Sequence, residues 1–338
     1  MSSDSQFVEG FSGVSKVVGG PAVSIGTFEV QFDASRAIRT KSLYGNGQMQ
    51  VRVLVLISGV DKDGNIVPLP DSVLNTVFPI YYNGGQSLDG DWFVWGVEND
   101  YLHELPSSGI STRLETLSEV QRKNIELQNT HVLEFWISSS VVRSVQVGAK
   151  VVLNGKTIRS NNSGVEKHDS SVTLNALLPP VYPIDYFRLD FFEITGAPPL
   201  TSIFKIYLGL NTPGRSVRLR RWRERNNSVG YPGSEVFRDV TNSAFSGTTF
   251  QYVIASSEVK KYPASLMKGG ETFDVAVNER SGELSILSIC NYGRRVGPKK
   301  LDTFFFTVVD EYGNDHKLSM RPNLNSKGEL RGVFLERG

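Results

Sequence analysis

Apolar and polar residues alternate along much of the chain with the two-residue period of a β-strand. Phe28, Val30 and Phe32 alternate with polar side chains, which predicts a strand buried on one face. Residues 51–57 are apolar apart from Arg52, which predicts a strand in the interior. Further strands are expected at residues 77–82, 92–95, 132–137, 172–177, 184–195, 203–210, 215–223, 250–256, 272–277, 284–289, 303–309 and 316–320.

Turn residues separate these strands. Residues 61–65 contain an Asp-Gly pair and Asn154-Gly155 lies between two apolar runs, so both sites are predicted to be hairpin turns. Pro79 has no amide hydrogen to donate, which places the strand at 77–82 at a sheet edge. Residues 60–65 and 309–314 share the pattern V-D-x-x-G-N, which we interpret as the same turn chemistry in two hairpins rather than as a domain duplication.

This pattern predicts an all-β protein of two or three β-sandwich units, jelly-roll or immunoglobulin-like, with at most one or two short helices. Thr112 and Glu115 form a possible capping box, so residues 111–128 are predicted to be a short helix or a linker. The expected division is a flexible N-terminal arm at 1–26, a β unit at 27–110, this helix or linker, an immunoglobulin-like sandwich at 129–195, and a third β unit at 196–338.

Composition narrows the class of protein. The 338 residues carry a formal net charge of +1, which argues against a dedicated nucleic-acid or membrane-surface protein. Cys290 is the single cysteine, which excludes an internal disulfide framework. The first residues lack the basic and apolar regions of a signal peptide, and no apolar run approaches membrane-spanning length. We therefore expect synthesis in a cytoplasm and no membrane insertion.

No familiar catalytic motif is present. Gly155-Lys156-Thr157 resembles part of a phosphate-binding loop, but position 150 is lysine where that loop requires glycine. The four histidines lack metal-ligand spacing. We therefore expect no catalytic residues, no cofactor and no metal site, and predict that the protein is not an enzyme. The alternative, an active site built from distant carboxylates, stays open.

The most unusual segment holds six arginines in eleven residues. Its apolar residues alternate with arginines until a one-residue shift near positions 220 and 221, which predicts an amphipathic strand with a bulge. Such a row can bind nucleic acid, anionic glycans or acidic protein surfaces, because guanidinium groups form forked contacts with oxyanions. The alternative is a solvated or subunit-facing edge. The candidate contacts are Arg215, Arg218, Arg220, Arg221, Arg223 and Arg225.

Aromatic residues gather between positions 81 and 101, among amide and carboxylate side chains. Aromatic rings stack on sugars and also anchor protein interfaces or fill cores, so these residues are candidates for glycan or interface contacts. They are Tyr81, Tyr82, Trp92, Trp95 and Tyr101.

Together these features suit a non-enzymatic structural protein of a virus or bacteriophage particle, such as a capsid, spike or tail component. Such proteins fold in a reducing host cell and gain stability by symmetric self-assembly. In this hypothesis the protein is a homo-oligomer in the virion and also contacts other virion proteins. The alternative is a glycan-binding module or adhesin, in which Trp92 and Trp95 would both be exposed.

Overall fold

The structure is a computed structural model that describes residues 20–32, 37–106, 129–163, 166–194, 201–223, 239–242, 248–254, 261–263, 274–292, 304–324 and 330–338. Nearly all of its regular structure is β, which confirms the all-β prediction. The described residues contain one α-helix, α1 (Asp71–Leu74), and one 3-10 helix, η1 (Ile184–Tyr186). A proline lies at the N-terminal cap of each, Pro70 and Pro183, where no amide donor is needed.

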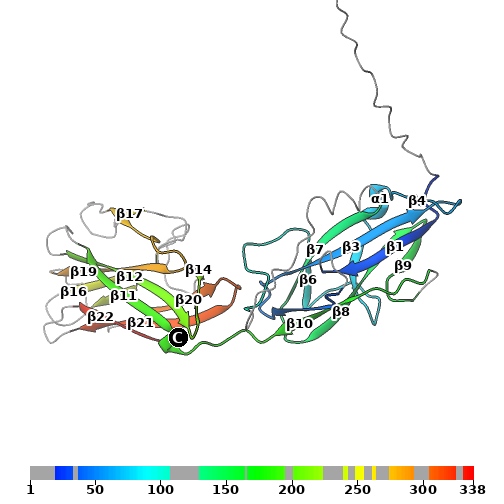
Figure 1. Cartoon of the computed structure of the whole chain (residues 1–338). Helices are drawn as coiled ribbons and strands as arrows, with labels where there is room; N and C mark the ends of the chain where they lie inside the picture. The colour runs from blue at the N-terminus through cyan, green and yellow to red at the C-terminus, as the bar shows by residue number, and fades with distance from the viewer. Residues whose placement is uncertain are drawn as a thin grey trace, which may run out of the picture.

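The strands form two sandwiches that lie side by side in Figure 1. One sheet of the first sandwich contains, in spatial order, β1 (Ser24–Gln31), β3 (Val51–Val60), β7 (His131–Ser139) and β6 (Trp92–Trp95), with β4 (Ile66–Val67) beside β3. Its other sheet contains β2 (Thr40–Tyr44), β10 (Val172–Leu177), β8 (Ser144–Leu153) and β5 (Phe78–Tyr81), with β9 (Lys156–Arg159) beside β8. β1-β3-β7-β6 opposite β5-β8-β10 is the strand arrangement of an immunoglobulin-like constant-type sandwich.

This pairing differs from the division expected from the sequence. β3 pairs with β7 from Val51↔Ile137 to Ile57↔His131, and β5 pairs with β8. Residues 27–110 and the strands between 129 and 177 therefore share two sheets and form one sandwich, because neither part alone contributes enough strands to both layers. Residues 1–19 of the expected arm and the expected helix or linker at 111–128 lie outside the described residues, and residues 24–26 belong to β1.

The second sandwich begins at β11, within the range expected for the preceding unit. One sheet contains β11 (Phe187–Ile194), β12 (Thr201–Thr212), β19 (Leu284–Tyr292), β16 (Thr248–Ile254) and β15 (Asp239–Asn242), with β13 (Arg215–Val217) beside β12. The facing sheet contains β14 (Leu219–Arg223), β20 (Phe304–Asp310), β21 (Asp315–Leu324) and β22 (Leu330–Arg337). A separate hairpin joins β17 (Lys261–Pro263) and β18 (Asp274–Ala276).

The two V-D-x-x-G-N segments form the same turn. Asp61 accepts hydrogen bonds from the amides of Asp63 and Asn65, and Asp310 accepts them from the amides of Tyr312 and Asn314, at 2.8–3.0 Å. The glycine of each turn has a positive φ, +86° and +82°. The first turn follows β3, which pairs with β1, the first strand of its sandwich. The second turn follows β20, which pairs with β14 and β21 and not with β11, the first strand of its own sandwich. The motif thus occupies non-equivalent places, as the turn-chemistry interpretation expects.

The second of these turns joins the sandwiches. Tyr312 is buried with the apolar core of the first sandwich, and its ring meets that of Tyr44 edge-on at 5.7 Å. The Asn46 amide donates to the Tyr312 carbonyl at 2.9 Å, and the Leu102 amide donates to the Glu311 carbonyl at 2.8 Å. Apolar packing together with directed hydrogen bonds fixes the two sandwiches against each other at this point.

This contact predicts a loss of stability in alkali. Burial raises the pKa of Tyr44 to about 12, and burial also raises the pKa values of Tyr182 and Tyr312. An unfolded tyrosine ionises near pH 10, so the unfolded state is favoured increasingly as the pH rises from about 10 to about 12. Denaturant titrations across this range should give a steeper fall for the wild type than for Tyr44→Phe. Equal slopes in the two proteins would contradict the prediction.

Candidate functional site

The arginine-rich segment passes from one sheet of the second sandwich to the other. β13 pairs with β12, and β14 pairs with β20 in the facing sheet. The register shifts between Leu219 and Arg221, which confirms the predicted bulge. The single strand predicted at 215–223 is wrong, because the chain changes sheets at Arg218. Val217 and Leu219 are buried on either side of this crossing and hold it against the core.

The arginines therefore do not form one row. Arg215 donates to the Tyr312 hydroxyl at 2.9 Å, and Arg221 lies over the ring of Tyr101 and bonds its hydroxyl, so both serve the contact between the sandwiches. Arg223 pairs with Asp315 at 3.4 Å. Arg225 lies outside the described residues. The two that remain, Arg218 and Arg220, are exposed and line a depression.

The turn at residues 278–283, between β18 and β19, forms the other wall of this depression. The Leu219 amide donates to the Gly282 carbonyl at 2.8 Å, which fixes the turn beside β14. Gly282 has a φ of +83°, and a Cβ atom there would lie 2.9 Å from Cγ of Arg218, so only glycine lets this arginine lie against the turn. The depression has a volume of about 330 Å³. Its polar lining comes from Arg218, Arg220, Asn278, Arg280, Ser281 and Glu283.

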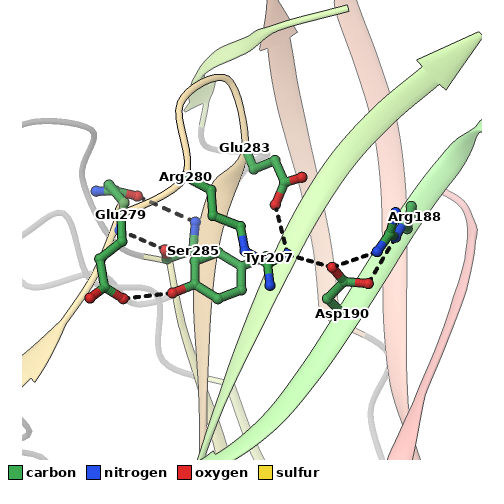
Figure 2. Close-up of polar contacts among 8 residues, drawn as sticks. Arg188, Asp190, Tyr207, Glu279, Arg280, Glu283 and Ser285 are labelled. Carbon is green, nitrogen blue, oxygen red and sulfur yellow. Dashed lines mark hydrogen bonds and ion pairs between the residues drawn. The ribbon is translucent and has the colours of Figure 1, made fainter. Parts of the chain in front are cut away.

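Arg280 is held by contacts on the outer face of the sheet that contains β11 and β12 (Figure 2). Its guanidinium pairs with Asp190 and, at 3.3 Å, with Glu283, and it stacks 4.2 Å from the centre of the Tyr207 ring. Arg188 forms a forked pair with the same Asp190 carboxylate at 2.8 and 2.9 Å. These contacts orient Arg280 but also use much of its capacity for hydrogen bonds.

Two carboxylates of this cluster, Asp190 and Glu279, are held in the ionised form. Hydrogen bonds from Arg188 and then Arg280 lower the pKa of Asp190, and hydrogen bonds from Lys205 and Tyr207 lower the pKa of Glu279. A general acid needs the opposite, a carboxyl whose pKa is raised toward the working pH. The cluster can therefore orient side chains and bind charged groups, but it is poorly suited to donate a proton.

The aromatic candidates separate into three environments. Trp92 is 1% exposed and lies in the core of the first sandwich, so it does not offer the exposed ring that a glycan site at Trp92 and Trp95 requires. Tyr101 is buried at the contact between the sandwiches. Trp95 is 48% exposed on β6. Tyr81 and Tyr82 are partly buried and bond the Asp89 carbonyl and the Asp169 carboxylate, respectively.

A second depression, of about 400 Å³, follows the outer edge of β1. Ser170 accepts a hydrogen bond from the Val30 amide at 2.9 Å, and Glu166 accepts one from the Ile25 amide at 2.9 Å. Arg39 lies within hydrogen-bond distance of the carbonyls of Val30 and Ser171. These side chains bond backbone groups that an edge strand would otherwise leave unpaired, so we assign them a structural role.

Comparison with protein-family models and with curated proteins found no match for the chain. Within the described ranges, no group of three or more His, Cys, Asp or Glu side chains is placed to hold a metal ion. The described helices are all too short to cross a membrane. The arginine-lined depression is therefore the main candidate site, and the sequence pointed to two of its three arginines. Arg280 could not be found that way, because the fold brings it from about 60 residues along the chain.

Proposed function

We propose that the chain is a non-enzymatic structural protein of a virus or bacteriophage particle, a capsid, spike or tail component that acts by self-assembly. The observation that carries the proposal is the exposed edge strand β6. Among the described strands, β6 pairs with β7 alone. Its aromatic side chains Phe93 and Trp95 are 38% and 48% exposed, and the following Val97 is 76% exposed. Large aromatic side chains of this kind dominate the binding energy of protein interfaces.

A second copy of this chain is the partner that suits β6 best. The four residues of β6 carry no charge and no proline, so two copies can pair antiparallel without repulsion or loss of an amide donor. Such pairing of identical edges produces a closed two-fold contact. In that contact each Phe93 and Trp95 would be covered by the same residues of the other copy.

The charge state of the polar cluster supports a role other than catalysis. Asp190 is held ionised by two arginines, and Glu279 is held ionised by Lys205 and Tyr207. Ionised carboxylates that are already bonded to cations stabilise a surface but are unsuited to general acid catalysis. The contact made by Tyr312 also fits a structural role, because it fixes the two sandwiches relative to each other.

We expect the purified protein to form a discrete oligomer in light scattering coupled to size-exclusion chromatography, at low and at high salt. The contact at β6 is apolar, so added salt should not dissociate the oligomer. The double variant Phe93→Ser and Trp95→Ser should weaken the association by several hundred-fold, because each aromatic hot spot contributes about 2 kcal/mol and each step of about 1.4 kcal/mol is a factor of ten.

Phe334→Ser is a matched control, since Phe334 is a similarly exposed aromatic on β22, an edge strand of the other sandwich. It should leave the oligomer unchanged. A monomer at every concentration and salt would overturn the self-assembly proposal. Loss of the oligomer at high salt, or in the Phe334 variant only, would show that the copies do not associate through β6.

A further inference from the structure

The arginine-lined depression holds more positive charge than its own carboxylates neutralise. Three arginines line it, Arg218, Arg220 and Arg280, and among the described residues the only lining carboxylate is that of Glu283. Glu283 is already 3.3 Å from Arg280, which also pairs with Asp190. Arg218 bonds the neutral hydroxyl of Ser281 at 2.8 Å. Within the described part of the chain, Arg220 has no hydrogen bond or ion pair.

Two guanidinium groups that have no carboxylate partner in the described ranges thus face one small hollow. Arg218 and Arg220 lie on either side of the buried Leu219, and both are exposed and line the depression. The stacked Arg280 and the turn at Gly282 form the opposite wall. Guanidinium forks bind carboxylate, sulfate and phosphate oxygens in two-point contacts, so an oxyanion bound here would relieve the repulsion between the arginines.

We propose that this depression binds an acidic sugar, that is, a glycan residue that carries a carboxylate or sulfate group. Arg218 and Arg220 would hold the oxyanion. The hydroxyl of Ser281 would donate a hydrogen bond to a sugar hydroxyl or accept one from it. The carboxylate of Glu283 would accept a hydrogen bond from a sugar hydroxyl. The inference is independent of the proposed self-assembly, because β6 and the depression belong to different sandwiches.

Two observations favour a sugar over nucleic acid. The volume of about 330 Å³ suits one or two sugar rings, whereas a nucleic-acid strand requires a continuous positive track along its backbone. The wall of the depression contains Glu283, and Asp190 lies next to it on Arg280. These carboxylates can accept hydrogen bonds from sugar hydroxyls, which the phosphodiester backbone of DNA lacks.

Calorimetric titration of the full chain with three probes tests the proposal: 3′-sialyllactose, a heparin hexasaccharide and a 20-nucleotide single-stranded DNA. We expect one or both saccharides to bind more tightly than the DNA. 3′-Sialyllactose presents a carboxylate alone and the hexasaccharide also presents sulfates, so the comparison identifies the preferred acid group. The double variant Arg218→Gln and Arg220→Gln should raise the dissociation constant of the bound saccharide by about tenfold or more.

The matched control is the double variant Lys317→Gln and Arg321→Gln, which removes the same charge from two exposed residues of β21 in the facing sheet. It should change the dissociation constant by less than about twofold, and thermal unfolding should confirm that both variants fold. No saccharide binding, equal weakening in the two double variants, or an unchanged constant in the Arg218 and Arg220 variant would overturn the proposal. DNA binding as tight as that of the saccharides would overturn it in favour of a phosphate backbone.

Discussion

Replacing Asp310 with alanine is expected to lower the free energy of unfolding by about 3–5 kcal/mol. The carboxylate is fully buried and accepts bonds from the amides of Tyr312 and Asn314 and from the Asn314 side chain. A ring nitrogen of the buried His316 lies 3.1 Å from it. Alanine would leave these donors buried without acceptors, and chemical denaturation would measure the loss.

Asp61→Ala is the matched control, because Asp61 closes the same turn away from the contact between the sandwiches. It should lower stability less than Asp310→Ala. Only Asp310→Ala should also separate the sandwiches, since its turn carries Tyr312 into the first core. Small-angle scattering would detect the separation as a larger radius of gyration. Equal losses of stability with no change in radius would contradict the role assigned to this turn.

Trp92→Ala is expected to destabilise the first sandwich by about 3–5 kcal/mol, because the indole fills core volume that alanine leaves empty. In the monomer, at protein concentrations too low for association, Trp95→Ala should cost less than about 1 kcal/mol, since almost half of that side chain is exposed and its indole donates to Ser138. Thermal and denaturant unfolding of the two variants give the comparison. Similar losses would contradict the assignment of Trp92 to the core and Trp95 to the surface.

Local rules predicted several parts of the fold from the sequence. Asn154 and Gly155 both have positive φ, as the predicted hairpin turn requires, and β8 and β9 pair across them. Pro79 lies in β5, which is the edge strand that its missing donor predicted. In each case a residue or dipeptide has one backbone property that few structures accommodate. Such properties are independent of the rest of the chain.

Strand pairing was not predictable in the same way. β3 and β7 are joined through register partners about 80 residues apart, and nothing in either apolar run identifies the other. The sequence therefore suggested separate units on either side of residues 111–128, where one sandwich exists. The prediction of one continuous arginine row was wrong for a related reason, because the segment crosses between sheets. The crossing directs Arg215 and Arg221 toward the first sandwich. It leaves Arg218 and Arg220 beside Arg280.

The parallel pair of β2 and β10 affects how the first sandwich bears mechanical load. β2 is the second strand of this sandwich along the chain. β10 leads into the chain that enters the second sandwich (Figure 1). Because the two strands are parallel, tension applied before β2 and after β10 pulls on opposite ends of their ladder. The five residue pairs from Thr40↔Thr173 to Tyr44↔Leu177 are then sheared together instead of peeled apart one at a time. Under such a load the lifetime of the sandwich depends on its rate of unfolding rather than on its equilibrium stability.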